Sequence, residues 1–171
     1  MDLPDVVSTV RLRLELVSPA EARAMLGGGR GPAFHPDYPR KDDLDALSMI
    51  GETGSSWSPR HVVRAFDGLV VGSIGFYGPP EPADDGVPEA EVGYGLVADA
   101  RGHGAATEAL RGLLEQTDQL GVRVRASTEP GNKASVRVLA KCGFTSLRGS
   151  DADGNLVMAR PVSSRPADPG R

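Results

Sequence analysis

The sequence has few of the residues that build covalent cross-links or metal centres. Its 171 residues contain one cysteine, Cys142, and three histidines, His35, His61 and His103. A single thiol cannot form an intrachain disulfide or a thiolate zinc cluster, which favours a cytoplasmic protein. The histidines are too scattered for a metal-binding spacing, so we expect no metal site.

Long apolar runs and an overall basic excess are also missing. No segment approaches the roughly 18 apolar residues of a membrane span, and no basic, then hydrophobic, segment opens the chain as a secretory signal would. The formal net charge of −4 disfavours nonspecific binding to nucleic acid. Residues 101–148 nevertheless carry 8 basic and 4 acidic side chains, which indicates either a site for a small anion or ordinary scatter of surface charge.

The chain does have the composition of one folded domain. A length of 171 residues predicts a single domain, and 39% hydrophobic with 25% charged residues is typical of globular chains. We expect this domain over residues 1–162 and a mobile Ser/Pro-rich tail over 163–171. Strands precede, separate and follow helices, so the expected fold class is α/β (α+β), with a mixed central sheet of about six to seven strands flanked by helices.

Hydrophobic periodicity locates the elements. Alternation of apolar and polar residues predicts a strand over 10–17, and an apolar stripe predicts a helix over 104–120. The run Ser-Pro-Ala-Glu at 18–21 predicts a helix start. Further strands are expected over residues 61–66, 69–77, 90–97, 122–128, 144–147 and 156–160, and further helices over 41–50 and 132–142.

The most informative segment is a glycine-containing turn between a strand and a helix. Gly93 and Gly95 lie within the strand and suit a bulge or a close backbone approach. The turn itself reads Arg-Gly-His-Gly at 101–104. Small residues there let unpaired backbone N–H groups at the helix start approach a phosphate. The turn lacks the Gly-Lys-Ser/Thr ending of a P-loop, and a simple tight turn is the alternative for this motif alone.

The wider pattern resembles the acetyl-CoA site of the GNAT superfamily of N-acetyltransferases. The resemblance rests on Glu-Val-Gly-Tyr at 91–94, Arg-x-x-Gly-x-Ala at 101–106, and the later run with Asn132, Ser135, Lys141, Gly143 and Phe144. It covers about residues 8–160 and is nearest to the RimJ/RimL-like branch of ribosomal-protein N-terminal acetyltransferases. It implies that parallel strands over 90–97 and 122–128 splay apart and admit the pantetheine arm of acetyl-CoA.

The resemblance also implies which residues hold the cosubstrate. Backbone amides of the turn and the first helical turn are expected to bind the pyrophosphate, with two residues of the later helix facing the arm from the other side. The expected cofactor-binding residues are Leu96, Val97, Arg101, Gly102, His103, Gly104, Ala105, Ala106, Thr107, Asn132 and Ser135.

The implied reaction is direct attack of a primary amine on the thioester. The amine must lose a proton, and Glu91 is the candidate base, with Glu89 on the same strand face as the alternative. A solvated strand-edge charge is the other interpretation of both carboxylates. A backbone N–H near residues 92–94 is the expected donor to the oxyanion.

The sequence departs from the family at the usual general acid. Many family members carry a tyrosine seven residues after the asparagine that begins the helix, but Leu139 stands there. Ser135 and Tyr94 are the candidate substitutes. Because of this departure, a noncatalytic acyl-CoA-binding sensor or regulatory domain of the same fold is the alternative function.

The acceptor is expected to be a small-molecule or peptide amine. A protein N-terminus, a polyamine, an amino acid and a drug-like amine all fit the sequence. The acidic group Asp42, Asp43 and Asp45 is expected to be a solvated helix start, although a cationic acceptor would also benefit from the acid-rich first half. We expect no nucleic-acid or membrane partner, and a monomer or homodimer.

Overall fold

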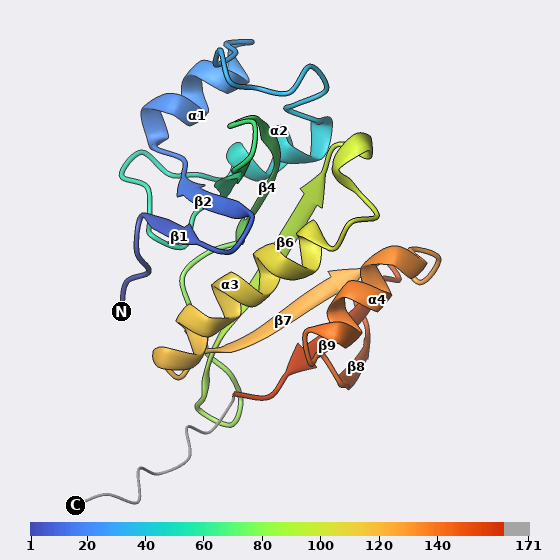
Figure 1. The fold of residues 1–171 in the computed structure, drawn as a ribbon. Coiled ribbons are helices and arrows are strands. Elements are labelled where there is room, and N and C mark those ends of the chain that lie inside the picture. The colour runs from blue at the N-terminus through green and yellow to red at the C-terminus, as the bar shows by residue number, and fades with distance from the viewer. Residues whose placement is uncertain (163–171) are drawn as a thin grey trace, which may run out of the picture.

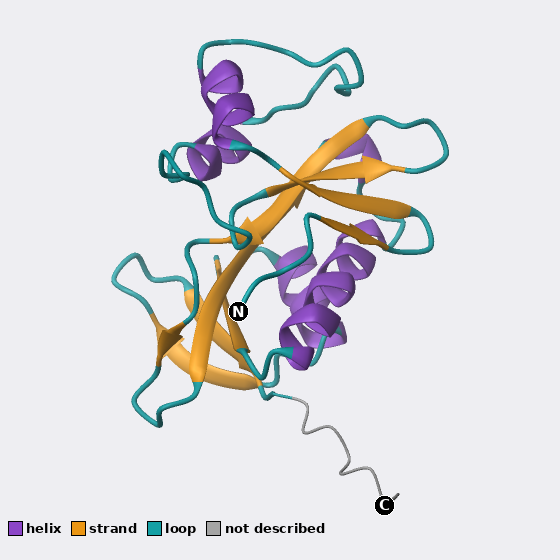
Figure 2. Cartoon of the chain, turned by 90° about the vertical axis from the view of Figure 1, so that its left-hand side faces the viewer, coloured by secondary structure: helices purple, strands orange, loops and turns teal. Residues whose placement is uncertain are grey.

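A computed structural model describes residues 1–162, in which one mixed sheet has helices on both sides (Figure 1, Figure 2). The expected mobile tail over 163–171 lies outside the described residues. The helices are α1 (Pro19–Leu26), α2 (Lys41–Leu47), α3 (Ala105–Gln119) and α4 (Lys133–Lys141), with a 3₁₀ turn, η1 (Ala98–Ala100). The strands are β1 (Val6–Ser8), β2 (Leu12–Leu16), β3 (Arg60–Arg64), β4 (Val70–Phe76), β5 (Glu81–Pro82), β6 (Pro88–Leu96), β7 (Arg123–Thr128), β8 (Ser146–Ser150) and β9 (Leu156–Arg160).

The sheet confirms the expected fold class. Its strand order is β1-β2-β3-β4-β6-β7-β9-β8, with β5 paired to β6. Only β6 and β7 pair in parallel among the described strands; the other neighbours are antiparallel. Within residues 1–162 the sheet has nine strands instead of the expected six to seven. The additional strands, β1 and β5, have 3 and 2 residues, too few for an alternating pattern to be recognised.

The predicted elements are present with shifted ends. The strand expected over 144–147 begins at Ser146, because Phe144 follows α4 as a core residue with 1% exposure. The strand expected over 61–66 ends at Arg64, where the turn to β4 begins. That turn closes with a 2.8 Å hydrogen bond from the Gly68 N–H to the Arg64 carbonyl.

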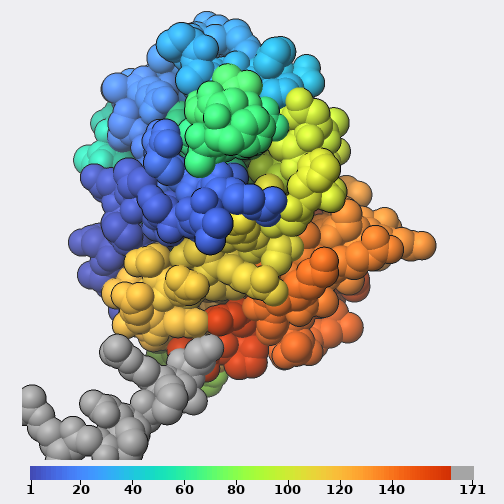
Figure 3. Space-filling model, in the orientation of Figure 1, coloured from blue at the N-terminus to red at the C-terminus, as the bar shows by residue number. Residues whose placement is uncertain are grey.

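Helix α3 packs across the sheet and also holds the N-terminal hairpin. Its apolar face buries Leu110, Leu113 and neighbouring residues, as the stripe predicts. In its first turn, Glu108 accepts hydrogen bonds from the Thr9 hydroxyl (2.5 Å) and from the backbone N–H and Nε of Arg11 (2.8 and 2.7 Å). Figure 3 shows the blue N-terminal segment lying against the yellow α3. The hairpin therefore fixes the position of the α3 start.

Strands β6 and β7 diverge, and this divergence leaves part of the β6 edge without a neighbouring strand. Their parallel pairing is confined to residues 89–91 of β6 and 123–125 of β7. Beyond this shared end the two strands run apart (Figure 1). Strand β6 remains paired with β4 over residues 92–96. The expected splay between these strands is confirmed, and beyond Glu91 the edge of β6 toward β7 has no strand partner; the space between the diverging strands is called the gap below.

Strand β6 does not contain the bulge suggested by its glycines. Its pairing with β4 shows no register shift over residues 92–96. A Cβ at Gly93 would approach the Tyr77 hydroxyl to 2.7 Å, and a Cβ at Gly95 would overlap the Arg40 guanidinium. The glycines therefore make room for side chains from other elements to lie against the strand.

Candidate active site

The turn before α3 presents a group of backbone N–H donors. Gly102 and Gly104 have φ of +80° and +79°, a conformation that glycine adopts without steric strain. The Glu108 N–H bonds to the Gly104 carbonyl, so the N–H groups of residues 104–107 have no partner within the helix. Such N–H groups, with the positive end of the helix dipole, suit a phosphate. The structure thus brings together the predicted pyrophosphate-binding residues Gly102, Gly104, Ala105, Ala106 and Thr107.

Three basic side chains flank this turn. The Arg101 Nε donates to the Leu96 carbonyl at 2.9 Å, which closes the loop between β6 and α3. Arg101 and His103 are both exposed. Arg11, which the sequence analysis did not single out, lies at the same helix end: a Cβ at Gly104 would be 3.5 Å from its Nη2. Arg11 is paired with Glu108 at 2.7 Å, so the exposed Arg101 is the cation that adds an electrostatic preference for an anion.

The edge of β6 that faces the gap carries backbone groups available to a ligand. The Tyr77 N–H donates to the Glu91 carbonyl on the β4 side. Because neighbouring residues of a strand turn their backbone groups to opposite edges, residues 92, 94 and 96 direct theirs toward β7, and the Leu96 carbonyl already accepts from Arg101. The pairing with β7 ends at Glu91, so this edge is open beyond it. An extended amide chain can bind there as another strand would.

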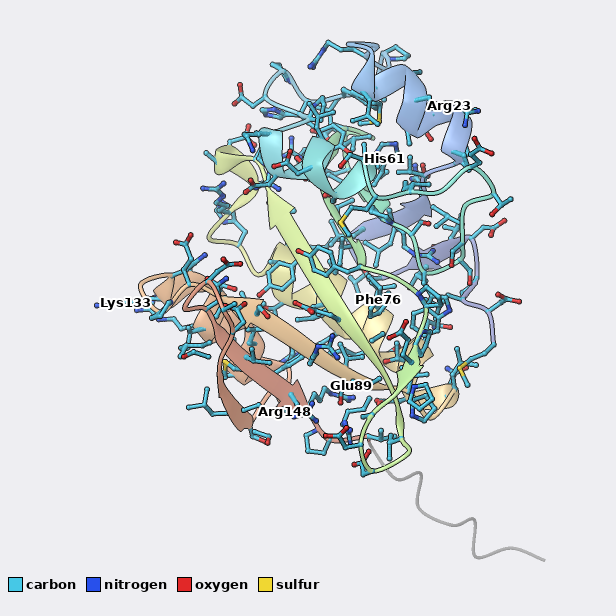
Figure 4. All side chains as sticks on the ribbon, turned by 180° about the vertical axis from the view of Figure 1, so that it is seen from behind. Arg23, His61, Phe76, Glu89, Lys133 and Arg148 are labelled. Carbon is cyan, nitrogen blue, oxygen red and sulfur yellow. The ribbon has the colours of Figure 1, made fainter. Side chains whose placement is uncertain are left out.

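The two candidate bases lie in different environments, and Glu89 is hydrogen-bonded to three arginines. Glu89 is 5% exposed and accepts hydrogen bonds from the Arg123 Nε (2.5 Å), the Arg125 Nη1 (3.0 Å) and the Arg148 Nη1 (2.7 Å). Figure 4 shows Glu89 beside Arg148. Burial alone would raise the pKa of Glu89, but the three arginines outweigh it and lower the pKa to about 2. This carboxylate holds β6, β7 and β8 together and is unsuited to accept a proton.

Glu91 lies at the closed end of the gap and remains accessible. It is the last β6 residue paired with β7. One carboxylate oxygen accepts from the Ser127 hydroxyl at 3.0 Å, and the other lies 3.4 Å from the Arg125 Nε. Its side chain is 25% exposed. The geometry therefore favours Glu91 over Glu89 as the base. Ser127, which orients it, has no distinctive signal in the sequence.

Tyr94 and Ser135 meet across the gap. The Tyr94 Oη lies 3.1 Å from the Ser135 Oγ, which joins β6 to the first turn of α4. Burial raises the pKa of Tyr94, and the hydrogen bond with Ser135 only partly offsets it, so the phenol is protonated at neutral pH. Asn132 caps α4 by accepting from the Ser135 N–H at 3.1 Å. Leu139 is fully buried in the core.

A cavity of about 480 Å³ opens between α2 with its following loop and the strands β4 and β6. Arg40, Asp42, Asp45, Tyr77 and Gly93 are among its lining residues. The Tyr77 side chain, which the sequence did not identify, reaches over Gly93. Burial, then the nearby carboxylates of Glu91 and Asp42, raise the pKa of Tyr77. The cavity thus approaches β6 next to the gap.

The acidic group at the start of α2 does not lie wholly in solvent. Asp42 and Asp45 are exposed, but Asp43 is fully buried, which corrects the prediction. The Asp43 Oδ1 accepts from the Arg40 Nη2 at 2.8 Å and from the Ser73 hydroxyl at 2.5 Å. Its burial follows from this pairing, because a lone carboxylate would not be stable there.

The remaining candidates have no site around them in residues 1–162. There, no group of three or more His, Cys, Asp or Glu side chains is arranged to hold a metal ion. Cys142 is 6% exposed, and burial raises the pKa of its thiol, which suits a core residue. No helix in that range is long and apolar enough to cross a membrane.

Solved structures show the same fold at low sequence identity. A ribosomal-protein-S5-alanine acetyltransferase from Vibrio fischeri aligns with a TM-score of 0.61 and 16% identity, over 94% of this chain and 98% of that one. An acetyltransferase from Agrobacterium tumefaciens gives 0.59 and 21%, over 93% and 95%. The microcin C7 self-immunity acetyltransferase, in complex with acetyl-CoA and AMP, gives 0.60 and 16%, over 90% and 94%. No curated protein matches the sequence.

A family model tests the same relationship on the sequence itself. The model described as an acetyltransferase (GNAT) domain matches residues 11–145. This range runs from the N-terminal hairpin through the splayed strands, the turn before α3 and helix α4. It therefore includes every element that builds the site. The chain belongs to the family of GNAT acetyltransferase domains.

Proposed function

We propose that the protein is an acetyl-CoA-dependent N-acetyltransferase that moves the acetyl group directly from the thioester to a primary amine. The observation that carries this proposal is the gap between β6 and β7, with Glu91 at its closed end and the Tyr94–Ser135 pair across it. The similarity to a structure that contains acetyl-CoA supports the choice of cosubstrate.

The residues present fit acetyl-CoA in two ways. The unpaired N–H groups of residues 104–107 and the exposed Arg101 suit its pyrophosphate. The open edge of β6 suits the amides of its pantetheine arm. A cosubstrate bound by both would extend from the start of α3 toward Glu91, because β6 leads from Glu91 to that helix. The thioester would then lie near residues 92–94.

The chemistry follows from the groups at that place. Glu91 takes a proton from the acceptor amine, and the amine nitrogen then forms a bond to the carbonyl carbon. A backbone N–H of the open β6 edge, near residues 92–94, stabilises the oxyanion. As the carbon–sulfur bond breaks, Tyr94 donates its proton to the leaving thiolate. The proton held by Glu91 then passes to solvent, and Tyr94 regains a proton through Ser135 and solvent, so both side chains return to their starting states. The net result is an amide, free CoA and no covalent change in the protein.

We place the chain in the RimJ/RimL-like branch, which the similarity to a ribosomal-protein-S5-alanine acetyltransferase supports. A small-molecule or peptide amine is the corresponding acceptor. The cytoplasmic location and the monomeric or homodimeric state stay predictions from the sequence.

A thiol-release assay tests the proposed function. Acetyl-CoA is incubated with the protein and a panel of primary amines, including α-amino acids, polyamines and short peptides. We expect at least one class to accelerate CoA release and to gain the mass of one acetyl group on its amine. Calorimetric binding of CoA without amine-dependent release would contradict the proposal and favour the noncatalytic sensor.

A further inference from the structure

We propose that Arg40 binds a carboxylate of the acceptor, and that the acceptor is an amino-carboxylate of about dipeptide length. This inference rests on the proposed function and specifies its substrate class. It comes from the cavity between α2 and the strands β4 and β6, which holds a fixed cation next to the reacting end of β6.

The Arg40 guanidinium is held rigidly by the protein. Its Nε and Nη2 donate to the two carboxylate oxygens of Asp43 at 2.9 and 2.8 Å. Asp43 is fully buried and is held in turn by the Ser73 hydroxyl. Such a bidentate pair fixes the plane of the guanidinium. Arg40 is thus oriented before any acceptor arrives.

One side of this guanidinium is available to a ligand. Arg40 lines the cavity, and its side chain is 23% exposed. Its Nη1 has no hydrogen-bond partner within residues 1–162, and it is not among the buried unpaired atoms of that range. Planar guanidinium groups bind carboxylates through parallel, charge-assisted hydrogen bonds. An anionic group entering the cavity therefore has a preorganised partner.

The position of Arg40 along β6 sets the size of the acceptor. A Cβ at Gly95 would overlap the guanidinium, and a Cβ at Gly93 would lie 2.7 Å from the Tyr77 hydroxyl, so both side chains lie over the same face of β6. Residues two apart on a strand are separated by about 7 Å. An amine near Gly93 is thus about 7 Å from a carboxylate at Arg40. Two extended residues span about 7 Å. A single α-amino acid carries its amine and its carboxylate on one carbon, so it is too short to reach both positions.

The other charged residues of the cavity suit an acceptor that carries a positive charge at one end and a negative charge at the other. Asp42 and Asp45 line the same cavity and are exposed. Asp45 is paired with Lys41 at 2.7 Å, and Asp42 has no ion-pair partner in residues 1–162. A negative charge at the entrance attracts an ammonium group. The carboxylate of the same molecule then reaches Arg40, which lies farther in because it is half-buried.

The test compares free acids with amides in the wild-type protein. Dipeptides with different N-terminal residues are offered as C-terminal acids and as C-terminal amides, at saturating acetyl-CoA, and kcat/KM is measured by thiol release. We expect the acids to be better acceptors by about 10-fold or more, since a hydrogen bond to a charged group contributes at this level. Single α-amino acids are expected to be poorer than dipeptides.

A double variant, R40Q/D43N, assigns the preference to Arg40. It removes both charges together, because R40Q alone would leave Asp43 as an uncompensated buried charge. We expect the ratio of the acid and amide rates to fall to about one while the calorimetric affinity for CoA stays within about 3-fold. The control is R13Q, which removes an arginine from an exposed ion pair with Glu15 on β2.

The outcomes separate this inference from the proposed function. Equal rates for acids and amides, or acetylation of polyamines with no dipeptide accepted, would overturn the inference and leave the proposed function intact. Loss of CoA affinity in R40Q/D43N would place Arg40 at the cosubstrate and also overturn it. Binding of CoA with no transfer to any amine would overturn both. If the variant does not fold, the wild-type comparison decides.

Discussion

The replacement E89Q tests whether a buried charge cluster holds the closed end of the gap. Glu89 receives hydrogen bonds from three arginines on β7 and β8, and its side chain is 3% exposed. Gln keeps the shape and part of the hydrogen bonding but removes the negative charge. The arginines then lose their common partner. We therefore expect E89Q to be less stable than the wild type at neutral pH.

The expected magnitude follows from the pKa of Glu89. Folding lowers this pKa from 4.5 to about 2, because the arginine hydrogen bonds outweigh the effect of burial. At 1.36 kcal/mol for each pKa unit, the ionised form contributes about 3 kcal/mol near pH 7. A depressed carboxyl pKa means that this stability is present above pH 4.5 and is lost as the pH falls toward 2. The difference between the two proteins should therefore shrink to about 1 kcal/mol at pH 3.

Urea unfolding at several pH values measures this effect. At pH 7, E89Q should lose about 3 kcal/mol, equivalent to about 6–12 °C in melting temperature for a chain of this size. The control is E81Q, because Glu81 lies opposite Glu89 on β5 and is exposed; it should change stability by less than about 0.5 kcal/mol. A loss below about 1 kcal/mol in E89Q, or an equal loss at pH 7 and pH 3, would show that the charge of Glu89 does not stabilise this end of the sheet.

Three other predictions concern the site. G104V should raise the Kd for CoA, measured by calorimetry, at least 10-fold. The control G86V, at a loop glycine with the same φ of +79°, should lower the free energy of unfolding without changing this Kd. Equal CoA affinities of the two variants would show that the turn before α3 is merely structural. Y94F should lower kcat by about 10²- to 10⁴-fold with an unchanged CoA affinity, as loss of a general acid does, and a wild-type kcat would exclude this role. CoA at 100 times its Kd should stabilise the wild type by about 2.7 kcal/mol, and no rise in melting temperature at millimolar CoA would contradict the cosubstrate assignment.

Local patterns predicted much of the fold and the cosubstrate side of the site. Each of these patterns depends on one helix, strand or turn alone, so it can be recognised without knowing the tertiary structure. Examples are the apolar stripe of α3, the apolar–polar alternation of β2 and the glycines before α3. Asn132 likewise acts within its own helix as the N-cap of α4. The family resemblance named Tyr94 and Ser135 as separate candidate acids, but their contact at 3.1 Å was not predicted and comes from the structure.

The acceptor side could not be predicted because its residues are defined by long-range contacts. The sequence predicts that Asp43 is a solvated residue at the start of a helix. Its burial depends on Ser73, which is 30 residues away in the chain and donates a hydrogen bond to it. Glu89 and Glu91 are equivalent in the sequence, two residues apart on one strand face. Only the arginines from β7 and β8 distinguish them. Arg40 and Tyr77 belong to no recognisable motif, and the two glycines that accommodate them predicted either a bulge or a close backbone approach, without indicating which side chains lie there.

The most direct test of the account is the pH dependence of acetyl transfer in E91Q, with the amine that the wild type acetylates fastest. Glu91 lies at the closed end of the gap and is held by Ser127 at 3.0 Å, and in the proposed reaction it takes the proton of the acceptor amine. At pH 7, we expect kcat/KM to fall by about 10²- to 10⁴-fold with unchanged CoA affinity, and the deficit to narrow toward pH 9 as free amine becomes available. Wild-type rates in E91Q from pH 6 to 9 would show that the proton leaves by another route and would contradict the account.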